Sequence, residues 1–154
     1  MKNEMTMYDV NKYVSEQTWI KYSILLNLFE ESIKNMTLNQ NLIDIALQLK
    51  QQWKNIAIVT NNMDCFTTIT ISHNKLNEIF PHIINSSDYG MLKQEEGWKL
   101  FDIAMDKVGC IEYKDTLLID DSQTERDTFE KKWWHTFAYS DFKTFKQWAD
   151  IHLL

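Results

Sequence analysis

An α/β fold with a mostly parallel sheet is the class that this sequence predicts, on three observations. Short runs of consecutive apolar residues recur along the chain, and helical periodicity fills the stretches between them. The runs do not alternate with polar residues, which is typical of strands that helices cover on both faces. Gly and Pro are scarce, at 3 and 1 of 154 residues, which disfavours an all-β domain built on tight turns.

The first half of the chain carries three predicted helical stretches and two predicted strands. Amphipathic spacing predicts helices over residues 14–33 and 40–52. A branched apolar run at 56–59 then predicts the first strand. A helical stretch through Leu76 and Phe80 leads across Pro81 to a second strand at 82–84.

The second half repeats this alternation. A helix over residues 95–108 ends at Gly109, a residue typical of helix C-termini. The next elements are a strand at 116–119, a helix through Phe129, a strand at 136–139 and a closing helix at 142–153. No linker or low-complexity tract interrupts them, so we expect a single compact unit.

Composition excludes several classes of partner. The 16 Lys and Arg residues against 22 Asp and Glu give a net charge of −6, which is poorly suited to binding nucleic acid or an anionic membrane. The N-terminus lacks the apolar run of a signal peptide, and no apolar stretch is long enough to span a bilayer. Cys65 and Cys110 stand alone, which indicates buried thiols in a reducing compartment and no structural zinc. We therefore expect a cytoplasmic protein with no nucleic-acid or membrane partner.

Polar residues follow three of the predicted strands, where ligands of open parallel sheets bind. Thr60 and Asn61 follow the first strand, Lys93 lies beyond the second, and Asp120 and Asp121 end the third. A hydroxyl, an ammonium and two carboxylates at one edge suit a phosphoryl group and a hard divalent cation. Each also has a simpler interpretation: the first pair as helix caps, the lysine as a solvated surface residue, and the acids as helix N-terminal charges.

The aromatic and histidine residues carry no predicted chemistry. We expect the cluster around the last strand to pack in the core rather than stack on bases, since few basic residues interleave with it. Its members are Trp133, Trp134, His135, Phe137 and Tyr139. The four histidines have no metal-ligand spacing; they are His73, His82, His135 and His152.

Three segments resemble the second, third and fourth motifs of the haloacid dehalogenase (HAD) superfamily, in its helical-cap branch of mostly phosphatases. They occur in the family's order and are IAIVTNN at 56–62, INSSDYGMLK at 84–93 and LLIDDS at 117–122. The resemblance runs from about Leu42 to the C-terminus. It implies a Rossmann-like three-layer core over residues 39–154 and a short helical cap remnant over 1–38.

The resemblance also implies catalytic roles. Thr60 would bind a phosphoryl oxygen through its hydroxyl, the amide of Asn61 would add a donor, and Lys93 would offset negative charge. Asp121, with Asp120 beside it, would hold Mg²⁺ directly or through water. No other cofactor is implied.

Two further residues are of interest next to the fourth motif. Glu125 falls where many relatives place another acid or amide. Arg126 is alternatively an ion-pair partner for that glutamate.

The family's first motif, an apolar strand ending in Asp-x-Asp-x-Thr, has no clear counterpart. Asp9 and Asn11 echo it, yet the preceding stretch is short and half polar, so Asp9 is either the nucleophile or a residue that caps the first helix. In the family this strand lies between the strands that here end at Thr60 and Asp120. Its place is filled by residues 5–9, by direct pairing of the flanking strands, or by a strand from another chain.

Two functions remain open on the sequence. The first is a Mg²⁺-dependent phosphatase that acts on a small phosphorylated metabolite through an aspartyl-phosphate, with Asp9 or a residue outside this chain as the nucleophile. The alternative is a catalytically incomplete or truncated HAD-like domain that serves as a binding or interaction module. Either a second copy of the chain or a strand-donating partner chain would then complete the sheet.

Overall fold

Helices alternate with four short strands in the computed structural model, which describes residues 2, 4–109, 112–131 and 135–154. The strands are β1 (Ala57–Thr60), β2 (His82–Asn85), β3 (Leu117–Asp120) and β4 (His135–Ala138). Each begins and ends within one residue of its predicted run. β1 pairs in parallel with β2, and β3 in parallel with β4. The α/β class with parallel strands is therefore confirmed.

The strands form two separate sheets rather than one. The order is β1–β2 in the first sheet and β3–β4 in the second, and β1 does not pair with β3. Direct pairing of these two strands, one of the three sequence alternatives, is therefore wrong. Residues 5–9 do not fill the place between them either, because helix α1 (Met7–Thr18) begins within that stretch.

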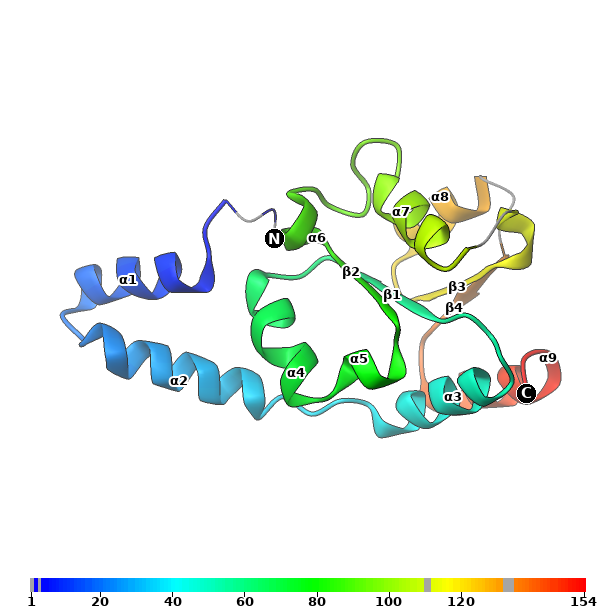
Figure 1. Cartoon of the computed structure of the whole chain (residues 1–154), viewed down its shortest axis with the longest axis horizontal. Helices are drawn as coiled ribbons and strands as arrows, with labels where there is room; N and C mark the ends of the chain where they lie inside the picture. Colours follow the sequence, from blue (N-terminus) through cyan, green and yellow to red (C-terminus); the bar gives the residue numbers. More distant parts are fainter. Residues whose placement is uncertain (1, 3, 110–111, 132–134) are drawn as a thin grey trace.

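Helices cover both sides of the strands (Figure 1). On one side, α7 (Lys99–Lys107) and α8 (Gln123–Lys131) contribute Phe101, Met105 and Phe129, a buried cluster that contacts Val59 of β1 and Leu118 of β3. On the other side, α3 (Gln40–Gln51) and α9 (Phe142–His152) form a second cluster around the buried Phe145, against which Phe137 of β4 packs. Neighbouring residues on a strand face opposite sides, so both helix layers meet the same strands.

The N-terminal helices form a hairpin that projects from this core (Figure 1). Helix α1 ends at Trp19, whose backbone is left-handed at φ 60, and α2 (Tyr22–Lys34) begins after Lys21. The single helix predicted over residues 14–33 is therefore wrong. The apolar spacing continues across the break because Trp19 and Ile20 lie within it, although both are exposed. Helix α2 contains no buried residue.

The remaining elements are short. A π-helical turn (Phe66–Thr70), α4 (Ile71–His73) and α5 (Leu76–Ile79) connect β1 to β2; α6 (Ser86–Tyr89) follows β2, and a 3-10 turn (Tyr113–Asp115) precedes β3. Helix α7 begins at Lys99 rather than at the predicted residue 95, because Glu96, Gly97 and Trp98 all have positive φ.

Cys65 is buried, as expected, and Cys110 lies outside the residues that the structure describes, as do Trp133 and Trp134. Among the described helices, none combines the length and apolar character that crossing a bilayer requires.

Candidate functional site

Lys93 connects the carboxyl ends of the two sheets. Its backbone N–H donates to Oδ1 of Asn61, just beyond β1, at 2.7 Å. Its side-chain Nζ donates to Oδ2 of Asp120, the last residue of β3, at 2.9 Å. The structure therefore brings together three residues that the sequence singled out, from three separate segments.

The ion pair of Lys93 with Asp120 is largely removed from water. Lys93 is 9% exposed, so its interpretation as a solvated surface lysine is wrong. A buried ammonium requires a close anion, and Asp120 provides it. Removing either partner would leave an uncompensated charge in a nearly buried position, which makes the pair sensitive to substitution.

The end of β3 is fixed by further hydrogen bonds. Oδ1 of Asp120 accepts from the backbone N–H of Ser122 at 2.8 Å. Arg126 donates to the carbonyl of Asp120 at 2.7 Å and to the side chain of Gln123 at the same distance. The guanidinium thus orients the strand end, and its hydrogen bonds go to these two acceptors rather than to Glu125.

Glu125 adds a buried carboxyl to this edge. The residue is 7% exposed, and its Oε2 has no hydrogen-bond partner among the residues that the structure describes. Burial raises the pKa of Glu125; the positive charge of Lys93 opposes this rise, and the negative charge of Asp120 adds to it. The sequence resemblance drew attention to this residue, but only the structure shows an unpartnered buried oxygen.

Thr60 and Asn61 do not act as helix caps. The hydroxyl of Thr60 makes no hydrogen bond within the part of the chain that the structure describes, and the residue is half-buried. The side chain of Asn61 donates to Gln94 at 3.1 Å, in addition to accepting from Lys93. Asn61 therefore positions the loop that carries the lysine, and Thr60 leaves a hydroxyl free for a ligand.

The carboxylates at this edge fit only part of a Mg²⁺ site. Within the described residues, no group of three His, Cys, Asp or Glu side chains is placed to hold a metal ion. Both oxygens of Asp120 accept hydrogen bonds, whereas Asp121 is exposed and Glu125 has one unpartnered oxygen. Mg²⁺ takes six oxygen ligands and keeps several waters, so further oxygens from water or a ligand would be needed.

Asp9 belongs to the start of helix α1. The N–H and the hydroxyl of Thr6 donate to Oδ2 of Asp9 at 2.9 and 2.6 Å, and the N–H of Asp9 donates back to Thr6. These hydrogen bonds lower the pKa of the Asp9 carboxyl. This reciprocal arrangement is a capping box. The capping interpretation of Asp9 is confirmed, and no strand precedes it among the described residues 2 and 4–8.

A buried polar network that the sequence did not predict holds the end of β2. Asn85 is fully buried, and its Nδ2 donates to the carbonyl of Met63 at 3.0 Å and to Ser87 at 2.8 Å. The hydroxyl of Ser86 accepts from the N–H of Asn62 and donates to its carbonyl. These contacts lock the ends of β1 and β2 together. The available signal was a run of small polar residues directly after a buried strand.

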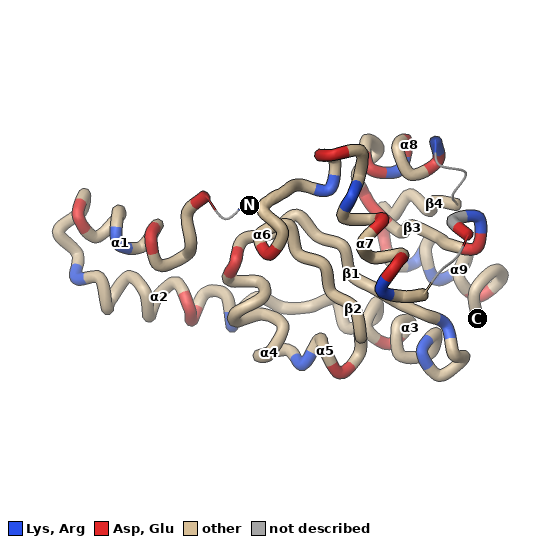
Figure 2. The backbone as a smooth tube through the Cα atoms, turned by 45° about the horizontal axis from the view of Figure 1, so that its top comes forward, with Lys and Arg blue, Asp and Glu red and all other residues tan. Residues whose placement is uncertain are grey.

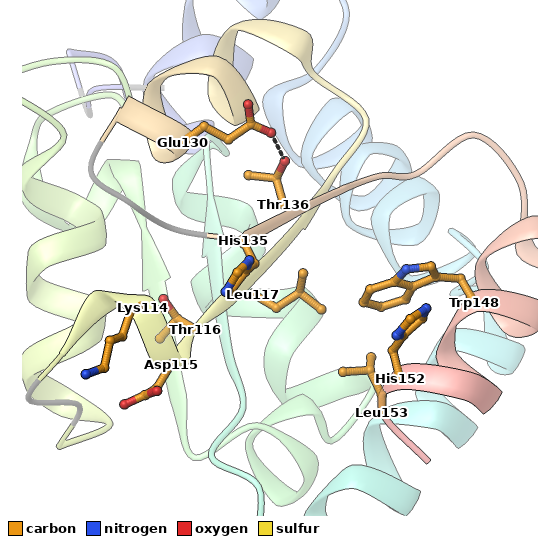
Figure 3. Close-up of a pocket in the computed structure, with 10 residues that line it drawn as sticks. All are labelled: Lys114, Asp115, Thr116, Leu117, Glu130, His135, Thr136, Trp148, His152 and Leu153. Atoms are coloured by element: carbon orange, nitrogen blue, oxygen red, sulfur yellow. Dashed lines mark hydrogen bonds between the residues drawn. The ribbon is translucent and has the colours of Figure 1, made fainter.

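The pocket in Figure 3 lies at the opposite end of the second sheet. It has a volume of about 510 Å³. Its lining includes Leu117 and His135, the first residues of β3 and β4, together with Trp148 and His152 of α9. The amino ends of parallel strands face away from the carboxyl edge. This pocket is therefore separate from the polar residues at that edge, Thr60, Asn61, Lys93 and Asp120, which we call the Lys93 cluster.

The fold and the cluster together define an α/β protein with a polar site at the carboxyl edge of parallel strands. The family model for haloacid dehalogenase-like hydrolases matches residues 2–129. The chain therefore belongs to this family, and the resemblance to the HAD superfamily is confirmed.

Solved structures support the fold. The HAD family enzyme bt-2542 of Bacteroides thetaiotaomicron, in complex with magnesium and inorganic phosphate, is similar with a TM-score of 0.71 at 16% identity, over 94% of this chain and 75% of that one. A predicted HAD-like family hydrolase of Porphyromonas gingivalis is similar with a TM-score of 0.70 at 14% identity, over 96% and 75%. No curated protein matches the sequence.

Proposed function

We propose that this protein is a HAD-like phosphatase that binds a small phosphorylated compound at the Lys93 cluster and uses Mg²⁺. The observation that carries this proposal is the buried ammonium of Lys93, paired with Asp120 at the carboxyl edge where β1 ends at Thr60. A phosphoryl group carries negative charge on several oxygens, and preorganised donors in a desolvated position stabilise that charge effectively.

Each residue of the cluster has a distinct task in this proposal. The carboxylate that attacks the phosphorus is not among these residues, and because Asp9 is held in a capping box, a residue outside the described part of the chain supplies it. The hydroxyl of Thr60 donates to a phosphoryl oxygen, and the ammonium of Lys93 offsets the charge of the group. Asn61 is a positioning residue, because it holds the backbone of Lys93. The complex of the Bacteroides enzyme with magnesium and phosphate supports the choice of ligands.

Asp121 and Asp120 are the residues we assign to Mg²⁺, with the unpartnered oxygen of Glu125 nearby. When bound, the cation would neutralise charge on the phosphoryl oxygens. The chain's own contribution is to hold Asp120 in place through Ser122 and Arg126.

A second candidate is a binding module with no turnover. The position of Asp9 favours it, because the carboxylate that echoes the family's nucleophile is held in a capping box at the start of α1. Such a module would bind phosphate at the same cluster and would release none from an ester.

Lys93→Ala is the variant that tests the site. We expect it to abolish binding of inorganic phosphate and to lower any release of phosphate from an aryl phosphate with Mg²⁺ by about 10²- to 10³-fold, as for loss of one preorganised donor. Titration calorimetry and a colorimetric phosphate assay measure the two effects. Lys99→Ala is the matched control, because Lys99 is exposed and pairs with Glu96 on the protein surface.

The outcomes separate the two candidates. Phosphate release that depends on Lys93 supports the phosphatase, whereas phosphate binding without release at high protein concentration supports the binding module. An unchanged phosphate affinity in Lys93→Ala would overturn both.

Asp9→Asn tests the capping interpretation from the side of activity. We expect phosphate binding, and any phosphate release, to stay at the level of the unchanged protein, because Asp9 interacts with Thr6 and not with the cluster. A selective loss of release in this variant, with the fold intact by circular dichroism, would restore Asp9 as a candidate nucleophile.

A further inference from the structure

The pocket at the amino ends of β3 and β4 is built from separate segments of the chain (Figure 3). The turn before β3, the end of α9 and Glu130 of α8 form its sides. Leu117 and His135, the first residues of β3 and β4, lie between the turn and α9. Its volume of about 510 Å³ falls in the range of small-molecule sites. The pocket is therefore large enough for a ligand with one or two rings.

Part of the lining of this pocket is apolar and aromatic. Leu117, Trp148 and Leu153 are half-buried, so each side chain keeps an open part. The ring of Trp148 is fixed by two neighbours, because the centroids of Phe137 and His152 lie 4.8 and 4.9 Å from its own. A rigid aromatic side chain offers contact area at little cost in conformational entropy. This part of the lining suits the flat, apolar body of a ligand.

The rim of the pocket carries negative charge. Asp115 and Glu130 line it, and no cation among the described residues pairs with either carboxylate. Lys114 lines it too, but its ammonium pairs with Glu112. The hydroxyl of Thr136 donates to the carboxylate of Glu130 and orients it (Figure 3). The rim therefore presents two carboxylates whose charge a bound cation would neutralise.

Two imidazoles also line the pocket, one from β4 and one from α9. Neither His135 nor His152 makes a side-chain hydrogen bond with another described residue. No group of three His, Cys, Asp or Glu side chains within the described residues is placed to hold a metal ion. An imidazole carries hydrogen-bonding nitrogens at two positions of its ring. These rings therefore suit the polar groups of an organic ligand better than a metal.

The distribution of charge over the molecule favours a cation at this end of the second sheet. β1 and β2 contain no Lys, Arg, Asp or Glu, whereas α8 carries residues of both signs (Figure 2). The chain as a whole has a net charge of −6, which attracts cations rather than anions at long range. The charge of the whole chain and that of the rim therefore act in the same direction.

We propose that this pocket binds a small organic cation, in which a protonated amine is joined to a flat aromatic ring. The ring lies in the apolar part of the pocket, beside Leu117 and Trp148. The ammonium faces the carboxylates of Asp115 and Glu130. This site is independent of the Lys93 cluster, so the proposal stands even if no phosphoryl group binds there.

Tryptamine and indole-3-propionate test the preference for a cation, because they share an indole ring and carry opposite charges. Each exposed ion pair favours binding by up to about fivefold, and the same carboxylates repel an anion. We therefore expect tryptamine to bind the full chain at least about tenfold more tightly in titration calorimetry. Equal affinities would overturn the proposal, as would no binding of tryptamine at about 10 mM, given its size.

The double variant Asp115→Asn, Glu130→Gln tests the pocket from the protein side. Both residues are exposed, and the amides keep the shape of the side chains. We expect the preference for tryptamine over indole-3-propionate to shrink to about twofold or less. Glu16→Gln with Glu31→Gln is the matched control, since it removes two exposed carboxylates of the α1–α2 hairpin. An equal loss of preference in both double variants would assign it to net charge alone and overturn the site.

Hydrogen exchange locates the bound amine. Tryptamine should slow amide exchange at Leu117 and His135 and leave β1 and β2 unchanged. Inorganic phosphate should leave the affinity for tryptamine unchanged, because the Lys93 cluster lies at the other end of the strands. Protection confined to β1, β2 or the α1–α2 hairpin, or competition by phosphate, would place the amine elsewhere and overturn the proposal.

Discussion

The β1–β2 sheet (the first half) and the β3–β4 sheet (the second half) are built from equally short strands, and yet they are buried to different degrees. In the first, Ile84 and Asn85 of β2 are both 0% exposed. In the second, no residue of β3 or β4 is fully buried. The first half is enclosed by α7 and by the polar network after β2, whereas the second lies between Phe129 of α8 on one side and aromatic side chains of α9 on the other.

In the second half, aromatic side chains of α9 pack against the half-buried β4. Phe137 of β4 lies 5.3 Å from Phe145 and 4.8 Å from Trp148, between ring centroids. Aromatic ring pairs at such distances stabilise the fold by more than the burial of their apolar surface alone. Half-buried strands are therefore held by the helix side chains that pack against them, and three substitutions test this.

Phe145→Ala should have the largest effect. Phe145 is 1% exposed and lies at the centre of the cluster that α9 shares with α3 and β4. Truncating a buried phenylalanine costs about 3–5 kcal/mol of the free energy of unfolding. Urea denaturation measures the loss, and Ile151→Ala on the exposed face of the same helix should change stability by less than about 0.5 kcal/mol. Similar stability of both variants would mean that α9 does not hold the second half.

Asn85→Ala should destabilise the first half by a smaller amount. The substitution leaves the carbonyl of Met63 and the hydroxyl of Ser87 without their buried donor. An unsatisfied buried polar group costs about 1–3 kcal/mol, again measurable in urea. Asn27→Ala on the exposed surface of α2 should be neutral. A neutral Asn85→Ala would show that the network is not what encloses β2.

Acid should weaken the second half through a small effect at Asp141, the N-cap of α9. The N–H and hydroxyl of Thr144 donate to its carboxylate and lower the pKa of Asp141. Because the folded pKa lies below the unfolded value, the ionised cap stabilises the fold at neutral pH, and this contribution is lost as the pH falls through the lowered pKa.

Asp141→Asn removes the ionisable cap and so isolates its contribution to stability at different pH values. In this variant the melting temperature should fall less steeply as the pH is lowered. Asp9→Asn, on the hairpin, should leave the protection of β4 against hydrogen exchange unchanged. If the melting temperature of Asp141→Asn falls with decreasing pH as steeply as that of the unchanged protein, other carboxyls cause the acid sensitivity.

The sequence predicted the four strands and the residues that lie at the polar carboxyl edge, because both follow from local patterns. Continuous apolar runs identified β1 to β4, and the rule that ligands bind at carboxyl ends selected Thr60, Lys93 and Asp120. The break at Trp19 was missed, since the apolar spacing continues through it and a left-handed tryptophan has no sequence signal.

The contacts within the site depended on tertiary structure. That Lys93 is buried and paired with Asp120, and that Arg126 holds the carbonyl of Asp120, involves residues on different elements. The sequence offered three ways to fill the place of the missing strand, of which the structure excluded two, and it did not predict that the strands would form two sheets. Strand pairing is a long-range property, so local patterns could not choose among them.

The position of Lys93 has a consequence for how the molecule unfolds. At the carboxyl edge this residue belongs to both halves, through its backbone on one side and its ammonium on the other. Such a link adds to the coupling that the two halves already have through the shared cluster of Phe101, Met105 and Phe129. The same side chain that we assign to the phosphoryl group therefore also helps decide whether the core melts in one cooperative transition or in two.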